Sequence, residues 1–209
     1  MQNGATPLHS AAQNRHVEVI AALLQAGANK DAAKENGATP LHIAAQNGHV
    51  EAIAALLQAG ANKDAATKNG WTPLHITAQN GHVEAIVALL QAGANKDAAE
   101  ETGATPLHTA AWNGHVEAIA ELLQAGANKD AAKEVRPGGG SWGGATGATP
   151  LYIAAQNGHV EAIAALLQAG ANKDAATKVR PGGGGGDVST VVLPVVVWQQ
   201  GLWDPRPMH

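Results

Sequence analysis

The sequence contains no cysteine and no phenylalanine among its 209 residues, and tyrosine occurs once. The absence of cysteine excludes disulfide bonds, thiolate catalysis and zinc sites with cysteine ligands. A hydrophobic core must therefore be built from alanine, leucine, isoleucine and valine. The missing cysteines also fit a reducing compartment, so we expect an intracellular protein, cytoplasmic or nuclear.

Basic residues are scarce as well: 13 Lys and Arg stand against 17 Asp and Glu, for a formal net charge of −4. Nucleic-acid binding needs a basic stripe, which this balance does not supply. The longest apolar stretch, Val191–Trp198, is interrupted by Pro194, and a membrane span needs about 20 apolar residues. The segment Met1–His9 has no basic start and no apolar run of the kind seen in secretory signals. We therefore expect a soluble chain with no nucleic-acid or membrane partner.

The sequence is dominated by an internal repeat. The tetrapeptide Thr-Pro-Leu-His recurs at intervals of 33 residues, starting at Thr6, Thr39, Thr72 and Thr105. It returns as Thr-Pro-Leu-Tyr at Thr149, which is 33 plus 11 residues further on. The repeat units are Asn3–Glu35, Asn36–Lys68, Asn69–Glu101, Thr102–Glu134 and Thr146–Lys178. The chain thus divides into repeats one to four (1–134), a Gly-rich insertion (135–145), repeat five (146–178) and a non-repeat tail (179–209) that we expect to be disordered.

Each unit predicts two short helices and a projecting loop. In the second unit, Thr39 is a good N-cap and Pro40 suits the first helical position, where a missing N–H costs nothing. That helix ends near Gly48, and a second runs from about Val50 to Ala59 with its apolar residues on one stripe. The following loop ends in Asn69-Gly70, which has the composition of a turn. Helices this short are unstable alone, so each unit must bury its stripe against its neighbours.

The stretch Asn36–Glu51, with Leu56-Leu57 and Gly60-Ala61 after it, closely resembles the ankyrin repeat family. The resemblance covers about four-fifths of the chain. It implies an all-α repeat fold, an ankyrin-repeat solenoid of antiparallel helix pairs with hairpin or loop fingers. It also implies protein–protein recognition by a monomer, with no cofactor and no small-molecule substrate.

The insertion and the tail share the opening Val-Arg-Pro-Gly-Gly-Gly, at Val135 and again at Val179. Three interpretations of these segments stay open. The insertion could be an elongated binding finger that presents Trp142, or a passive loop tolerated by the fold. Alternatively, both segments could be translated non-coding sequence, because each begins at the end of a repeat with a codon that could hold a splice donor.

No set of residues predicts catalysis or metal binding, so we expect no enzyme and no metal site. Nine of the ten histidines lie in two columns along the array, and helices packed about 10 Å apart cannot bring such a column onto one metal. The resemblance assigns these histidines to hydrogen bonds between fingers, loops and helices. The columns of glutamate and of aspartate, including Asp31 and Asp64, are most simply solvated faces. The glycine runs lack the Lys-Ser/Thr of a phosphate loop.

Two tryptophans break otherwise uniform surface columns. Trp71 follows the finger glycine where the other units have alanine, and Trp112 stands near the end of the first helix where they have glutamine. We expect both to face solvent on the side where the resemblance puts the partner, and tryptophan is enriched in binding hot spots. The predicted partner-binding residues are these two with a polar surround, namely Lys68, Asn69, Gln79, Asn80, Glu101 and Asn113. Neutral drift at exposed positions would explain the two tryptophans equally well.

Two functions follow from the sequence. The first is a binding module, an adaptor or scaffold that holds another protein on its concave face and finger tips. The alternative is an inert structural fragment or a recently duplicated array with no specific partner. This second hypothesis draws on the likeness of units two and five, which differ only at Asn36/Thr146 and His42/Tyr152.

Overall fold

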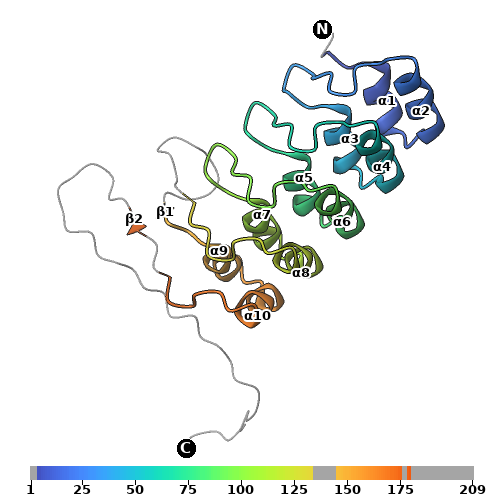
Figure 1. Ribbon diagram of the computed structural model, residues 1–209. Helices are drawn as coiled ribbons and strands as arrows, with labels where there is room; N and C mark the ends of the chain where they lie inside the picture. Colours follow the sequence, from blue (N-terminus) through green and yellow to red (C-terminus); the bar gives the residue numbers. More distant parts are fainter. Residues whose placement is uncertain (1–3, 134–144, 176–177, 180–209) are drawn as a thin grey trace, which may run out of the picture.

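The computed structural model describes residues 4–133, 145–175 and 178–179, which form a row of helix pairs (Figure 1). The five pairs in this part of the chain are α1 (Pro7–Gln13) with α2 (Val17–Gln25), α3 (Pro40–Gln46) with α4 (Val50–Gln58), α5 (Pro73–Asn80) with α6 (Val83–Gln91), α7 (Pro106–Asn113) with α8 (Val116–Gln124), and α9 (Pro150–Gln156) with α10 (Val160–Gln168). Odd-numbered helices pack on odd ones and even-numbered on even ones. The fold is an all-α repeat solenoid, as the sequence predicted. Its described helices all fall short of the length and hydrophobicity that a membrane span requires.

The odd-numbered helices begin where the repeat predicted, with threonine as the N-cap and proline as the first helical residue. Thr39 has an extended backbone before α3, with φ −95° and ψ 168°. Its N–H donates to Nδ1 of His42 at 3.1 Å, so a donor that the helix leaves unpaired is satisfied. At the other end of such a helix, Gly81 closes α5 in the left-handed conformation, with φ 68°.

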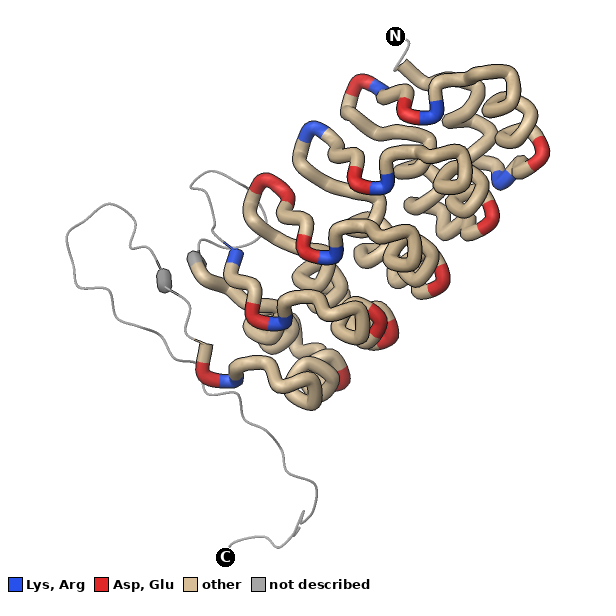
Figure 2. Tube along the Cα trace, viewed as in Figure 1, with Lys and Arg blue, Asp and Glu red and all other residues tan. Residues whose placement is uncertain are grey.

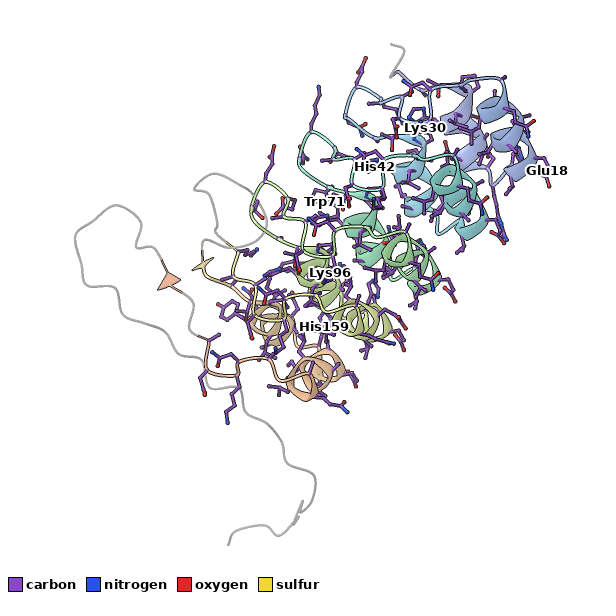
Figure 3. All side chains as sticks on the ribbon, in the orientation of Figure 1. Glu18, Lys30, His42, Trp71, Lys96 and His159 are labelled. Atoms are coloured by element: carbon purple, nitrogen blue, oxygen red, sulfur yellow. The ribbon has the colours of Figure 1, made fainter. Side chains whose placement is uncertain are left out.

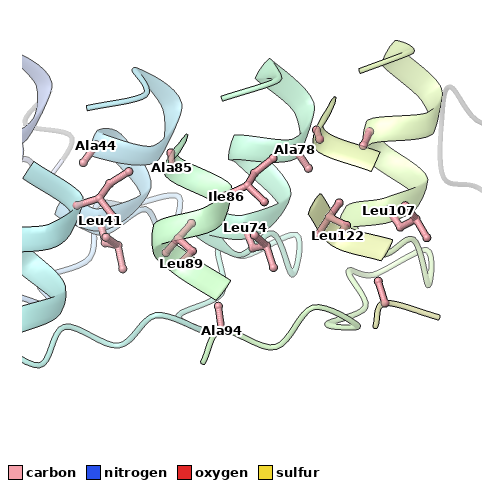
Figure 4. Packing of buried hydrophobic residues seen from close by; sticks show 14 of the residues in the cluster. Leu41, Ala44, Leu74, Ala78, Ala85, Ile86, Leu89, Ala94, Leu107 and Leu122 are labelled. Carbon is pink, nitrogen blue, oxygen red and sulfur yellow. The ribbon is translucent and has the colours of Figure 1, made fainter. Parts of the chain in front are cut away.

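The core is aliphatic and continues through all five helix pairs as one cluster (Figure 4). Leu74 of α5 and Ile86 of α6 are fully buried, and Ala78 and Ala85 beside them let the helices approach closely. Full burial of a side chain as large as leucine contributes about 1.5–3 kcal/mol. Because the cluster crosses every junction between pairs, a unit taken from the array would lose much of this energy.

The fingers are short turns that bond to one another side by side. In the finger before α5, the Thr67 N–H donates to the Trp71 carbonyl at 2.9 Å and the Gly70 N–H donates to the Thr67 carbonyl at 2.9 Å. The Lys68 N–H donates at 3.0 Å to the carbonyl of Asn36 in the preceding finger. Figure 1 shows the fingers projecting on the side of the odd-numbered helices. The fingers and these helices therefore border one continuous face.

Residues 135–144 of the insertion and 180–209 of the tail lie outside the described residues, and so do the predictions about Trp142 and about disorder in the tail. The chain on either side of the insertion is tied together. The Lys133 N–H donates to the Ala148 carbonyl at 3.1 Å. The two-residue strands β1 (Ala145–Thr146) and β2 (Lys178–Val179) pair antiparallel. Residues that the sequence placed at the edges of the insertion and the tail thus form a short strand pair beside repeat five.

Candidate protein-binding face

Trp71 is fixed through its backbone at the base of the finger before α5 (Figure 3). Its N–H donates to Oγ1 of Thr67 at 3.1 Å, and its carbonyl accepts from the Thr67 N–H and from Nε2 of His42 at 3.0 Å. The indole ring lies 5.8 Å from the His75 ring, centroid to centroid, at an interplanar angle of 43°. The ring is half-buried rather than fully exposed. An aromatic side chain held in this way loses little conformational freedom when a partner binds.

A hollow of about 450 Å³ lies beside Trp71, between the fingers and the first helices of repeats two and three. Its lining is formed by Asn36, Gln46, Thr67, Lys68, Asn69, Trp71, Ile76, Gln79 and Asn80. Carboxamides predominate, and each can both donate and accept hydrogen bonds, as a peptide backbone does. Trp71 and Ile76 supply the apolar surface, and Lys68 supplies a positive charge without a carboxylate in the lining.

The hollow brings together five of the eight residues predicted for partner binding, namely Lys68, Asn69, Trp71, Gln79 and Asn80. The other three, Trp112, Glu101 and Asn113, are not in its lining. Trp112 lies near the end of α7 and is half-buried, and its carbonyl accepts from Nε2 of His159 at 2.8 Å. Glu101 is exposed at the next finger, where its N–H donates to the Asn69 carbonyl at 3.3 Å. Of the two tryptophans, Trp71 therefore borders the hollow and Trp112 does not.

The side chains of Asn80 and Asn113 are exposed, and each also forms a hydrogen bond within its own helix. The Asn80 side-chain amide donates to the Ile76 carbonyl at 2.9 Å, and that of Asn113 donates to the Thr109 carbonyl at 2.9 Å. The asparagines of the other units bond in the same way. These bonds satisfy carbonyls near the helix ends and commit one donor of each amide.

Charges on the described residues lie at the finger tips, at the Lys–Asp pairs of the loops and on the even-numbered helices (Figure 2), and the odd-numbered helices carry none. At the fingers the sign alternates, because Lys68 is followed one repeat later by Glu100 and Glu101. Glu100 is occupied within its own finger, where Oε1 accepts from the Thr102 and Ala104 N–H groups at 3.0 and 3.1 Å. The exposed charges beside the hollow are thus Lys68 on one finger and Glu101 on the next.

The histidines of the first column tie each helix start to the following finger. In all four, Nδ1 accepts the N–H of the N-cap threonine at 3.1–3.3 Å, so the neutral ring carries its proton on Nε2. That Nε2–H donates to a carbonyl of the next finger at 3.0–3.1 Å. Burial lowers the pKa of His9, His42 and His75, and it lowers the pKa of His108 to about 4. These rings hold the finger face in place as neutral donors.

The second histidine column packs each repeat on the repeat before it. Nε2 of His115 donates to the Gln79 carbonyl at 2.9 Å, and a Cβ added at Gly81 would lie only 2.8 Å from the His115 ring. The first repeat differs, because Arg15 takes the glycine position there with φ 57°. At that junction His49 uses Nδ1 instead, and the bond goes to the Ala12 carbonyl at 3.0 Å. The histidine ring therefore changes its bonding where the glycine is missing.

The aspartate column is more than the solvated face that the sequence suggested. Oδ1 of Asp64 accepts the Asn95 N–H of the next repeat at 2.7 Å, and Asp31, Asp97 and Asp130 make the same bond. The neighbouring lysines lie across the same junctions: a Cβ built on Gly93 would be 3.7 Å from Cε of Lys63. The aspartates recur at the repeat interval, 33 residues within repeats one to four and 44 across the insertion, but their donors are backbone N–H groups, which the sequence does not single out.

Family models of ankyrin repeats match most of the chain. A model that describes three copies of the ankyrin repeat matches residues 1–67 and 56–133, and a model of a single ankyrin repeat matches residues 146–178. These matches leave out the insertion and the tail. Among curated proteins, no match to the chain was found.

Proposed function

The chain belongs to the ankyrin repeat family, and from this we propose that it is an adaptor or scaffold that binds another protein on its finger face. Ankyrin repeats are generally protein–protein interaction modules, and proteins built from them are typically not enzymes. In this proposal the partner is a protein, the chain needs no cofactor, and the contact is centred on Trp71.

The observation that carries the proposal is the hollow beside Trp71. It combines an aromatic anchor, an isoleucine and a ring of carboxamides, in a volume of about 450 Å³. Binding sites commonly combine apolar walls with a few polar groups that orient the ligand, at volumes of about 300–1,000 Å³. The equivalent positions in the other repeats carry alanine, so the chain offers this anchor at one junction of the array.

We place Lys68, Asn69, Gln79 and Asn80 around this anchor as the polar contacts. Trp112, with Glu101 and Asn113, would form a second contact further along the same row of helices. A partner that spans both would have to reach from one repeat to the next, as an extended segment or a broad surface does. Trp71 is expected to contribute more than Trp112, because it borders the hollow.

The proposal is tested by affinity capture from a lysate of the source organism, followed by binding measurements on each retained protein. The baits are the wild type, Trp71→Ala, Trp112→Ala and Gln156→Ala. Gln156 is the matched control, since it is exposed and takes the place of Trp112 in repeat five. Far-UV circular dichroism must show that all four baits are folded.

We expect a protein that the wild type and Gln156→Ala retain and Trp71→Ala loses. For the purified pair, removal of a hot-spot tryptophan costs about 2 kcal/mol, or roughly a thirtyfold increase in Kd. Equal binding by Trp71→Ala and the wild type would place the contact elsewhere. If no bait retained any protein, the hypothesis of an inert array would be favoured over an adaptor.

A further inference from the structure

The outer face of repeat one exposes residues that the other repeats bury. Pro7 is exposed, whereas the equivalent prolines, including Pro150 of repeat five, are buried. Leu23 is partly exposed, whereas its equivalents, including Leu166, are fully buried. Repeat five has a repeat before it and repeat one has none among the described residues, so the preceding repeat is what covers these positions. A small hollow of about 100 Å³ lies at this face, lined in part by Pro7 and Leu23.

The outer face of repeat five exposes the complementary set. Val160 is 68% exposed, whereas the equivalent valines, including Val17 of repeat one, are partly buried. Ile163 is partly exposed, whereas Ile20 and its other equivalents are fully buried. Repeat one has a repeat after it, so the following repeat is what buries these two positions.

At each end of the array, the described residues include one member of each contact pair between repeats but not the other. In the junctions after repeats two, three and four, the ring of the following histidine lies against the glycine that ends the first helix. At Gly158 of repeat five no described atom lies within 4 Å of an added Cβ, while His16 of repeat one is exposed. Likewise, lysine Cε atoms lie 3.7–3.8 Å from the Cβ position of four glycines, but none of the described residues fills this place at Gly27.

The same holds for the aspartate tie. Each junction in the array has an aspartate Oδ1 that accepts the asparagine N–H of the next repeat at 2.7–2.8 Å. Asp174 holds the aspartate position in repeat five, and its side chain is exposed. Asn29 holds the asparagine position in repeat one, and it is exposed too. One end thus presents the acceptor and the other end the donor of the same bond.

From these paired ends we propose that the chain associates head to tail, with repeat one of a second copy packed on repeat five. The junction would resemble the one between repeats two and three. On its repeat-five side, repeats two and five differ only at Asn36/Thr146 and His42/Tyr152, and the Tyr152 O–H replaces the imidazole N–H as a donor. On its repeat-one side, the helices depart from those of repeat three at Ser10/Ile76, Ala11/Thr77, Val19/Ala85 and Ala21/Val87. Val19, which is 47% exposed, would bring a larger apolar side chain to the position where Ala85 is buried. This proposal departs from the expectation of a monomer and goes beyond binding at the finger face.

The geometry excludes a closed dimer. Figure 1 shows repeats one and five at opposite ends of the row, so one copy cannot offer both ends to the same partner copy. An interface between two different faces that does not close on itself adds copies in line. The mass of the assembly should then rise with concentration instead of stopping at a dimer.

The test is sedimentation velocity of the full chain from micromolar to millimolar concentration, with one variant for each end. Pro7→Glu places a charge on the face of repeat one, and Val160→Glu places one on the face of repeat five. Both sites are exposed first residues of helices, where a carboxylate is favourable, so both variants should fold. Gln91→Glu, exposed at the end of α6 in the middle of the array, is the matched control for added charge.

We expect the average mass of the wild type and of Gln91→Glu to pass twice that of one chain as concentration rises. Each end variant alone should stay monomeric. An equimolar mixture of the two should stop at a dimer, because repeat five of Pro7→Glu can still bind repeat one of Val160→Glu, and the two outer faces of that dimer carry the added charges. A wild type that stays monomeric throughout would overturn the proposal. So would association that persists in both folded end variants, since it would run through another surface.

Discussion

Replacement of Gly81 by alanine tests how closely adjacent repeats pack. Gly81 has φ 68° at the end of α5, and an added Cβ would lie 2.8 Å from the His115 ring of the next repeat. The left-handed backbone costs alanine about 1–2 kcal/mol at any such site. The contact with the ring adds the cost of overpacking, about 1–3 kcal/mol, unless the ring moves. Movement of the ring would break its hydrogen bond to the Gln79 carbonyl, worth about 1 kcal/mol.

Gly158→Ala is the matched control, because Gly158 has φ 74° and none of the described atoms within 4 Å of an added Cβ. It should cost only the backbone term. We therefore expect Gly81→Ala to lower the free energy of unfolding by about 2–5 kcal/mol and Gly158→Ala by about 1–2 kcal/mol. Urea titrations followed by circular dichroism, at low protein concentration, measure both. Equal losses would refute the reasoning and would show that His115 rebonds at little cost, as His49 does beside Arg15.

Three further predictions concern the ties between repeats. Folding should weaken as pH falls from about 6.5 toward 4, because burial lowers the folded-state pKa of His108 to about 4 while the unfolded chain still takes up the proton near 6.5. The contribution of this pKa difference to the free energy of unfolding is on the order of 3 kcal/mol and is fully present above pH 6.5. His108→Gln should therefore make the urea midpoint less sensitive to pH between about 4 and 6.5. A pH profile equal to that of the wild type would contradict the prediction. Asp97→Ala should cost about 1 kcal/mol in the same urea assay through the lost bond to the next repeat, whereas Asp174→Ala should cost nothing in dilute protein. Arg15→Gly should let His49 bond through Nε2 as the later histidines do, which ¹⁵N chemical shifts of the ring report; unchanged shifts would mean that Arg15 does not direct the ring.

The repeat predicted the fold well, because its signals are local. Thr39 and Pro40 start a helix for reasons contained in those two residues, and the same pair recurs in every unit. The aspartate ties were missed because their partners are backbone N–H groups, which every residue carries and no side-chain pattern reveals. Only the spacing of Asp64 from the next asparagine, set by the stacking of repeats, brings donor and acceptor together.

The candidate site could be predicted only in part. Trp71 and its predicted polar neighbours come from one finger and the helix after it, and this nearness in sequence explains why they meet at one hollow. Trp112 was grouped with Trp71 because both break a uniform column. However, Trp112 holds in α7 the place that Gln79 holds in α5, and Gln79 lines the hollow whereas Trp112 does not. The step of one repeat is therefore what takes Trp112 out of the lining, and membership of a column does not reveal which junction a side chain borders.

The ties between repeats depend on a residue's position within its unit and hardly at all on which neighbour it meets. An in-frame excision of residues 69–101 would bring repeat two onto repeat four, and Asp64 would meet Asn128 as it now meets Asn95. The lysine, glycine and histidine positions at that junction would also meet the same residue types that they contact now. The number of units in such a gene can therefore grow or shrink by recombination between its own repeats without spoiling a junction. The contacts between repeats thus leave the length of the array free to vary.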